Sequence, residues 1–564
     1  MLSHTSEKVL AKVLAVGSGF TTIFLISDSI TDPVNVTKLV SLGVAAFVAL
    51  GILIACGLRD AINGSRVIWI LSGIFLSASA VSIYSSESPI SQGIYGSYGR
   101  NNGFLSYLFL IILLLATTTL NRLTSLNWIV VALLIAGTIN VVYSIWVISF
   151  GDFIGWSNPY GNILGTLGNP NFVGSFLGIF LASYLALGLG KSSPKWFKYS
   201  LLLVLPLTAF AIYDSSAIQG RVVGVAGIGI VVFFLVRSRF KPIFTWVYLV
   251  AAGVAGAFAA LGALQIGPLT SFIYKTSVSL RGQYWLAGWN TGETQPLTGV
   301  GMDGFGDWYR RARDIRAIEL PGVNTVVNAT HNVPLDMFAF GGWPLFVSYL
   351  LIFGLGGLSL VKAIARSRDY EPILVAITVA WVGYQLQSII SINQIGLAIW
   401  GWVLTGTAIA YERITRIGSS EDIPNTKIKL RNNDVAQQSK VVLTGAGFGL
   451  VGLLLALPPL TADAKWRGAQ VEQSVEALEK SMVPSYFNPP NSMKYLTNIE
   501  ILERSNLPDL ARRYTLEAVA WNPESFDLWK ALYLIRNSSA LEKELALENM
   551  KRLDPLNPDV TSIK

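Results

Sequence analysis

Cysteine, histidine and charged side chains are all scarce in this sequence of 564 residues. The single cysteine, Cys56, excludes an internal disulfide and a cysteine-based metal cluster. Charged residues make up 13% of the chain and hydrophobic residues 52%, a composition far from that of soluble domains. The sequence therefore indicates a membrane protein. The net charge of +8 does not require a nucleic-acid partner, because the basic residues gather in short loops between apolar runs.

Long apolar runs recur along most of the chain, and each is about 18–23 residues, enough to cross a hydrocarbon core about 30 Å thick. The first run is followed by no small-residue cleavage site, so we expect a retained anchor rather than a signal peptide. The predicted fold is an all-α polytopic membrane protein with about thirteen transmembrane helices. They are expected over 9–28, 37–56, 67–84, 104–121, 128–149, 171–189, 198–213, 219–236, 244–266, 334–361, 372–391, 394–411 and 441–461.

Lysine and arginine cluster in alternate loops, including 191–198, 237–241 and 362–368. The positive-inside rule then predicts a cytoplasmic N-terminus. With thirteen spans, the long loop 267–333 and the tail after residue 461 lie outside the cytoplasm. Arg100 and Arg221 are exceptions to the rule, because they occur in loops on the outer side.

Two domains are expected, a polytopic membrane domain over residues 1–461 and a helical domain over 462–564. Asn-Pro pairs recur in the second domain, and "LARRYTLEAVAWNPESFDLWKALYLI" resembles a tetratricopeptide helix–turn–helix unit, although a generic helical tail would also explain it. The stretches 414–439 and 462–470 have the composition of polar linkers.

"NATHNVPLDMFAFGGWPLF" places the only internal histidine, His331, directly before an apolar run. Asn332 is expected to cap the following helix, and Pro334 suits its first turn. The N-terminus of a helix attracts phosphate and disfavours an imidazolium ion. We therefore expect a neutral His331 that can accept a proton, although a histidine that only forms hydrogen bonds in a loop is an alternative.

Polar turns precede several other spans on the same side. "YGSYGRNNGF" contains Arg100, "SSAIQGRVVG" contains Gln219 and Arg221, and "SLRGQYWLAGW" places Arg281 on an amphipathic helix with Tyr284 and Trp285 expected at the lipid interface. Arginine pairs bidentately with phosphate oxygens, so these three arginines together predict a diphosphate site. Taken alone, each of these arginines is also explained as an anchor to lipid headgroups or as a cation at the lipid interface.

Other polar groups have simpler explanations. Asn169 and Asn171 in "GTLGNPNFVG" are expected to be helix caps rather than ligands. Arg310, Arg311, Arg313 and Arg316 alternate with acidic residues, which a solvated helix face explains. Asp28 and Asp32 lack a close Asp-x-Asp spacing and are treated as turn residues.

Along the chain, the motifs "YGRNNG", "GTLGNPNFVGSFLG", "QGRVVG", "RGQYWLAGW" with "LTGVGMDGFG", and "THNVPLDMFAFGG" occur in the order seen in the O-antigen ligase family of bacterial membrane glycosyltransferases. The sequence resembles this family over roughly residues 66–410. It implies transfer of a glycan from undecaprenyl diphosphate to an acceptor hydroxyl on the outer side of the cytoplasmic (inner) membrane, without metal, cofactor or nucleotide sugar. It also implies that Arg221 and Arg281 hold the diphosphate, that His331 is the general base or organises the site, and that Arg100 is a further basic position. Supporting roles are expected for Asn332, Gln219, Asn169, Asn171 and Trp285.

Several functions stay open at this point. The acceptor is a lipid core, a protein or another glycan, and the last case would make the protein a polymerase of the same superfamily. The repeats after residue 461 offer a surface for a protein partner. A transporter of lipid-linked glycans is less favoured, because transporters place polar residues at mid-membrane and the polar motifs here cluster at one surface. No carboxylate pair calls for a covalent intermediate, so direct inversion at the sugar is expected.

Overall fold

The computed structural model describes residues 3–59, 62, 65–417 and 432–563. It is 76% helix and contains no strand in that part of the chain, which confirms the all-α prediction. The part of the chain before residue 473, including the loop 267–333 that is predicted to lie outside and is called the outer loop below, contains α1 (His4–Ile23), α2 (Asn35–Cys56), α4 (Arg66–Ser85), α5 (Ile90–Tyr95), α6 (Phe104–Thr118), α7 (Leu123–Phe150), α8 (Pro170–Gly188), α9 (Lys195–Asp214), α10 (Ile218–Arg239), α11 (Pro242–Ala263), α12 (Thr270–Ile273), α13 (Thr276–Thr294), α14 (Phe305–Ala312), α15 (Val333–Arg366), α16 (Pro372–Ile390), α17 (Ile395–Ile417) and α18 (Asn432–Glu472).

All thirteen expected spans fall on helices, but ten helices of the described chain are long and apolar enough by themselves to cross a membrane. These ten are α2, α4, α7, α8, α9, α10, α11, α15, α16 and α18. The helix α6 is a shorter apolar helix, and α1 carries charges at Glu7, Lys8 and Lys12. The count of thirteen therefore stays a prediction.

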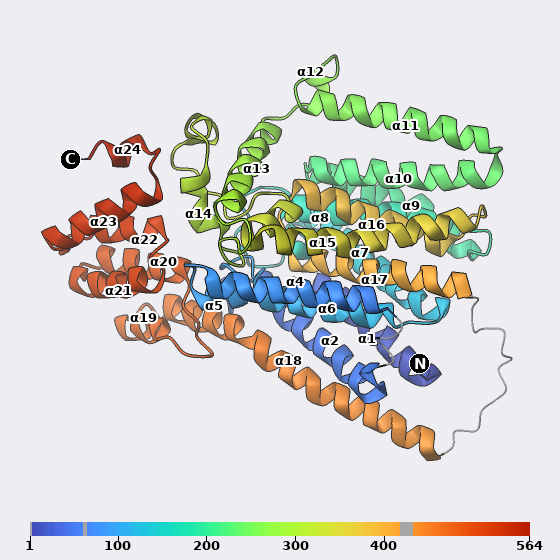
Figure 1. Cartoon of the computed structure of the whole chain (residues 1–564), viewed down its shortest axis with the longest axis horizontal. Coiled ribbons are helices and arrows are strands. Elements are labelled where there is room, and N and C mark those ends of the chain that lie inside the picture. Colours follow the sequence, from blue (N-terminus) through green and yellow to red (C-terminus); the bar gives the residue numbers. More distant parts are fainter. Residues whose placement is uncertain (1–2, 60–61, 63–64, 418–431, 564) are drawn as a thin grey trace.

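The long helices run beside one another along the long axis of the molecule (Figure 1). The outer-loop helices α13 and α14 lie at one end of this bundle, next to α5 and the C-terminal tail, whereas the N-terminus lies toward the other end. The motifs with Arg100, Arg281 and His331 thus share one end, as the alternation of basic loops predicts. Which side of the membrane this end faces stays a prediction.

Small residues allow the helix backbones to approach closely, as is common between helices in membranes. A side chain at Gly43 of α2 would collide with the backbone of Gly452 on α18, and one at Gly51 with that of Thr444. The same close packing at glycines joins α8 and α10, where Gly220 faces the backbone of Gly174. Because Gly220 lies inside the "QGRVVG" motif, this packing fixes the beginning of α10 against α8.

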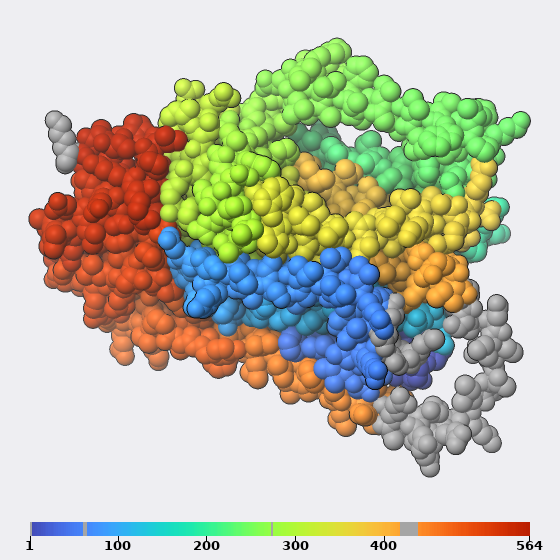
Figure 2. Space-filling model, viewed as in Figure 1, coloured from blue at the N-terminus to red at the C-terminus, as the bar shows by residue number. Residues whose placement is uncertain are grey.

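Toward the lipid, the helices α9, α10 and α11 expose large apolar side chains such as Leu202, Val225 and Trp246. Only 6% of the most apolar 18-residue stretch of α11 is buried, and this helix lies at the edge of the bundle (Figure 2). Such an exposed apolar surface is expected where lipid, rather than water, surrounds the helices.

The prediction that residues 462–470 form a linker is wrong, because α18 continues without interruption to Glu472. The helix persists because Ala462 and Trp466 are buried, and the indole Nε1 of Trp466 donates to Oδ1 of Asn498 in the tail at 3.0 Å. Part of the other expected linker, 418–431, lies outside the described residues.

The tail consists of α19 (Val475–Met482), α20 (Ser492–Arg504), α21 (Pro508–Trp521), α22 (Phe526–Leu534), α23 (Ala540–Leu553) and α24 (Pro558–Thr561). Consecutive helices pack on each other around a separate hydrophobic cluster, which includes Leu502, Ala518 and Leu532. This arrangement is a series of helix pairs. Its assignment to tetratricopeptide repeats, and the boundary of the domain, stay predictions.

Single cysteines in a Cys56→Ser background test the expected orientation. Ser271 in the outer loop and Ser505 in the tail are both exposed, so cysteines there should react in intact cells with a membrane-impermeant maleimide. A cysteine at the exposed Ser192, beyond the opposite end of α8, should react only after the membrane is opened. The reverse pattern of labelling would overturn the topology.

Candidate active site

The turn before α15 holds His331 in an unusual backbone conformation, with φ of 58°. The Asn332 side chain caps the helix by accepting from the N–H three residues on at 3.0 Å, so the expected cap is confirmed. Behind the histidine, the backbone N–H of Thr330 donates to Oδ1 of the buried Asp336 at 2.8 Å. The Thr330 hydroxyl donates to the Asn332 carbonyl at 2.8 Å. A left-handed backbone conformation is uncommon for residues other than glycine. The hydrogen bonds of the neighbouring Thr330 and Asn332 stabilise this conformation at His331.

Two aromatic residues of α13 lie against His331. The ring centres of Tyr284 and His331 are 5.4 Å apart, and Nε1 of Trp285 donates to the His331 carbonyl at 3.4 Å. The expectation that Tyr284 faces the lipid interface is wrong, because it is buried between His331 and Tyr309. Residues 284 and 285 therefore shape the wall of the histidine site.

The imidazole is held in its neutral form. Burial, followed by the positive charges of Arg281 and Arg100, lowers the pKa of His331 from its ordinary value of 6.5 to about 4. The sequence predicted this direction from the helix N-terminus. In the structure, desolvation is the larger cause and two arginines are the next.

Arg281 and Gln219 meet at the end of α16. The Nε of Arg281 donates to the Ile390 carbonyl at 2.9 Å, and Nε2 of Gln219 donates to the same oxygen at 3.2 Å. Arg281 Nη1 donates to the Ser277 carbonyl at 3.2 Å. Its Nη2 makes no hydrogen bond to any group within the described chain, so this nitrogen is available to a ligand. Burial lowers the pKa of the Arg281 guanidinium, which increases the benefit of a bound anion.

Arg100 is also buried, with 4% of the residue exposed, so an anchor to lipid headgroups does not describe it. Its Nη2 lies 3.2 Å from Oδ1 of the fully buried Asp303, and Nη1 donates to the Asn328 carbonyl. Oδ2 of Asp303 accepts from the backbone N–H of Ser97 at 2.7 Å. Burial raises the pKa of Asp303, and the Arg100 charge opposes this rise. The ion pair thus joins the "YGRNNG" turn to the glycine-rich turn of the outer loop.

Asp303 and Asp336 position the site but were not singled out from the sequence. The only signal was an acidic residue inside a glycine-rich turn for Asp303, and one in the first turn of α15 for Asp336. A carboxylate in the first turn of a helix is ordinarily explained by the helix dipole. Its bond to the N–H that precedes His331 depends on a turn that the sequence pattern does not specify.

The structure does not bring Arg221 into contact with this cluster. Arg221 is exposed on α10, where Nη2 donates to the Tyr213 carbonyl at 3.4 Å and the guanidinium lies over the Tyr213 ring. Residues two apart on a helix face different directions, so Gln219 points inward and Arg221 outward. Its part in diphosphate binding stays a prediction.

Asn169 and Asn171 lie at the N-terminus of α8. The side chain of Asn169 caps the helix by accepting from the Asn171 N–H at 2.9 Å, as expected, and its Nδ2 donates to the Tyr160 hydroxyl at 3.0 Å. The prediction that Asn171 is a cap as well is wrong, because it lies inside the first turn of α8, where its backbone carbonyl accepts from Ser175. Neither asparagine is bonded to His331 or Arg281 in the described chain.

The prediction of a solvated face for Arg310, Arg311, Arg313 and Arg316 is wrong for the first three. Arg313 Nη2 lies 2.6 Å from Oδ1 of Asp554, and Arg310 Nη1 lies 3.1 Å from Oδ2 of the same carboxylate. Arg311 pairs with Glu524. Only Arg316 is exposed. The acidic partners belong to the tail, more than 200 residues away, so these arginines attach the outer loop to the tail.

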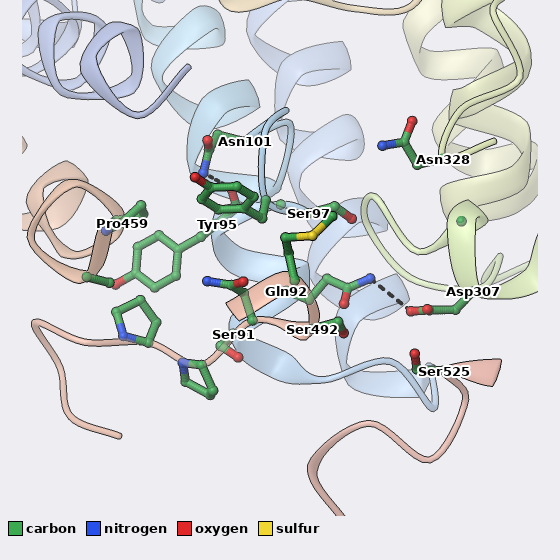
Figure 3. Close-up of a pocket in the computed structure, with 18 of the residues that line it drawn as sticks. Ser91, Gln92, Tyr95, Ser97, Asn101, Asp307, Asn328, Pro459, Ser492 and Ser525 are labelled. Carbon is green, nitrogen blue, oxygen red and sulfur yellow. Dashed lines mark hydrogen bonds between the residues drawn. The ribbon is translucent and has the colours of Figure 1, made fainter. Parts of the chain in front are cut away.

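Two hollows flank the site. One, of about 210 Å³, lies between α5, α14 and the tail, where Nε2 of Gln92 donates to Oδ2 of Asp307 at 3.2 Å (Figure 3). The other, of about 670 Å³, is lined by Arg100, Asn169 and the loops before α2 and α8. Arg100 thus lies between the histidine site and the larger hollow.

Residues 201–350 match the family model described as O-antigen ligase. The chain carries an O-antigen ligase domain. The resemblance to that family is therefore confirmed, and the ligase domain identifies a membrane glycosyltransferase of the ligase and polymerase type. The matched residues include Arg221, Arg281 and His331, whereas Arg100 lies before them. No curated protein matches the chain.

The pKa of His331 can be measured directly, because the chain has only one other histidine. In the ¹⁵N NMR spectrum of histidine-labelled protein, with His4→Gln for assignment, His331 should titrate near pH 4. Arg281→Gln removes one nearby positive charge and should raise this pKa, but not fully to 6.5, since burial is the larger cause. A wild-type value near 6.5 would refute the buried, cation-flanked site.

Asp554→Asn should loosen the tail from the outer loop. It leaves the buried Arg313 without its carboxylate, and it leaves Arg310 with Asp527, at 3.3 Å, as its remaining acidic partner. Breaking a buried ion pair costs about 3–5 kcal/mol. Hydrogen exchange should become faster in α14 and α23. Asp314→Asn is the matched control, because Asp314 pairs only with the exposed Arg316 at 3.9 Å. Equal exchange in both variants would show that the ion pairs do not hold this contact.

Proposed function

We propose that the protein transfers a glycan from undecaprenyl diphosphate to an acceptor hydroxyl, at the end of the bundle that holds His331. The observation that carries the proposal is a neutral imidazole flanked by two arginines, the half-buried Arg281 and the buried Arg100. The O-antigen ligase domain supports the reaction class. The proposed reaction uses no metal, cofactor or nucleotide sugar, because the donor is already activated by its diphosphate.

The arginines would stabilise the leaving group. When the bond between the anomeric carbon and the diphosphate oxygen breaks, negative charge grows on that oxygen. Fixed guanidinium groups in a site with little water stabilise such charge without having to reorganise. Arg281 is held at Nε and Nη1 by backbone carbonyls, so its Nη2 has a defined direction toward a phosphate oxygen. Arg221 would contact the donor farther out, from the exposed face of α10.

His331 would remove the proton of the acceptor hydroxyl as this oxygen attacks the sugar from the opposite face. A conjugate acid with a pKa of about 4 makes a weak base in the free protein. A bound diphosphate offsets the positive charges of Arg281 and Arg100, so it should raise this pKa. Burial is not relieved by the donor, and the pKa in the complex should therefore lie between about 4 and 6.5.

The acceptor hydroxyl belongs to a lipid core, a protein or another glycan, and the last case makes the enzyme a polymerase. The tail is attached to α14 through Asp554 and Glu524, so it lies next to the outer loop. This position favours a role in presenting the acceptor, and its helix pairs offer a surface to a protein partner.

His331→Gln tests the proposal with purified protein and a polyprenyl-diphosphate donor. Glutamine can form hydrogen bonds but cannot take a proton, so turnover should fall about 10²–10⁴-fold, the usual contribution of a positioned general base. His4→Gln is the matched control and should keep full activity. Near-normal turnover in His331→Gln would remove the histidine as a base, and no transfer by the wild-type protein from any such donor would refute the function.

The two pH profiles of the wild-type enzyme refine this test. The acidic limb of kcat/KM reports the free enzyme and should lie near pH 4, whereas the limb of kcat reports the complex and should lie higher. Activity should therefore be retained down to this limb and lost as His331 becomes protonated below it. Coincident limbs would contradict the proposed effect of the diphosphate charge.

A further inference from the structure

A tight turn between α19 and α20 exposes two aromatic side chains at its tip. Ser485 and Asn488 each donate a backbone N–H to the other's carbonyl, at 3.2 and 3.0 Å, and Tyr486 and Phe487 lie between them. Tyr486 is 53% exposed and Phe487 is 40% exposed. Glycine and small polar residues are usual in such turns, which ordinarily face water. Residues 483–488, the aromatic turn, therefore differ from a turn made for water.

Buried polar groups fix the base of the aromatic turn. The buried Asn488 donates through Nδ2 to the carbonyls of Ser481 and Val483, at 2.8 and 2.7 Å. Its Oδ1 accepts from Nζ of Lys494 at 2.8 Å. Every residue from 483 to 487 is nevertheless exposed. The rings at the tip are thus held out from the tail by a firmly bonded base.

The tip of the aromatic turn contacts α18, the helix that leads from the bundle into the tail (Figure 1). The Tyr486 hydroxyl donates to the Leu454 carbonyl at 2.9 Å, and the Thr461 hydroxyl donates to the Phe487 carbonyl at 2.7 Å. The Leu454 carbonyl lacks its ordinary helical donor, because residue 458, four positions on, is a proline. Tyr486 supplies the hydrogen bond that Pro458 cannot make.

The contacted part of α18 faces lipid. This helix is a candidate membrane span, its residues 441–462 carry no charge, and Leu450 and Leu454 are exposed. At 1.5 Å per residue this uncharged stretch is about 33 Å long, close to the thickness of the hydrocarbon core. Thr461 lies at its end. The backbone of the aromatic turn is therefore level with the boundary between hydrocarbon and headgroups, and the Tyr486 ring reaches below it.

Exposed aromatic residues mark the same boundary on other helices. Tyr84, Trp146 and Tyr213 are exposed and lie close to the C-terminal ends of α4, α7 and α9. Those ends lead into the loops on the side of the bundle that holds His331. Tyrosine and tryptophan gather where helices leave the hydrocarbon core. The aromatic turn continues this belt from the tail.

We infer that the aromatic turn, through Val483, Tyr486 and Phe487, docks the tail onto the headgroup region of the lipid bilayer. The exposed apolar surface of α18 continues directly into these side chains. The tail then has two attachments, one to lipid and one to α14 through its ion pairs. The membrane contact goes beyond the proposed function, because it is independent of the reaction that the protein performs.

Nitroxide labels on single cysteines in a Cys56→Ser background measure the surroundings of the turn in phosphatidylcholine nanodiscs. A label at Val483→Cys should collide more often with O₂, which concentrates in lipid, than with a water-soluble nickel chelate. Leu450→Cys on α18 is the lipid reference, and the exposed Ser505→Cys is the aqueous reference. The ratio of the two collision rates at 483 should be several-fold above that at 505. A ratio equal to that at 505 would place the turn in water, where a protein partner could bind it, and would overturn the inference.

A double-mutant cycle tests the bond between Tyr486 and α18. Tyr486→Phe leaves the Leu454 carbonyl without a donor in lipid, so the unfolding equilibrium constant, measured by SDS titration in lipid bicelles, should rise about tenfold, which equals about 1.4 kcal/mol. In a Pro458→Ala background the helix itself supplies an N–H, and the same substitution should have little effect. Tyr486 also approaches Tyr95 of α5, but this contact is common to both backgrounds and cancels. An equal effect in the two backgrounds, as expected where water reaches the carbonyl, would overturn the membrane contact.

Discussion

The turn at residues 328–336 is largely half-buried or buried, and the organisation of the site depends on how its backbone polar groups are satisfied. Asp336 accepts the N–H of Thr330, Asn332 caps α15, and the Asn328 carbonyl accepts from Arg100. An unpaired buried N–H or carbonyl would cost about 1–3 kcal/mol, so each bond constrains its partner as strongly as it constrains the turn. The left-handed conformation of His331 is the result, and Arg100 is held at the base of the same turn.

The outer loop is held from two sides by charged groups. Toward the bundle, Arg281 binds the last carbonyl of α16, and Asp303 pairs with Arg100. Toward the tail, Asp554 pairs with Arg310 and Arg313. Buried ion pairs contribute little net stability but strongly disfavour arrangements that leave one partner alone. The loop therefore has one preferred position between bundle and tail, and the site is positioned by contacts rather than by the loop's own secondary structure.

The sequence predicted features that depend on neighbouring residues. Apolar length revealed the helices, and the Asn332 cap followed from residues within one turn, since capping is local. The errors concern partners far along the chain. Arg313 looked like a solvated residue because Asp554 is 241 residues away, and Trp466 looked like part of a linker because Asn498 lies in another helix. A charge pattern cannot show whether a guanidinium meets water or a distant carboxylate.

The dependence on distant residues also explains why the sequence predicted the direction of the shift in the pKa of His331 but not its size. A helix N-terminus beside the residue was visible in the sequence and does disfavour the imidazolium ion. The depth of burial, and the approach of Arg281 and Arg100 from two other elements, depend on the tertiary structure and lower the pKa to about 4. Since part of this effect comes from fixed positive charge, an anionic donor reverses that part and only that part. In the proposed mechanism, a base that gains strength when the diphosphate is bound couples deprotonation of the acceptor to the presence of the donor.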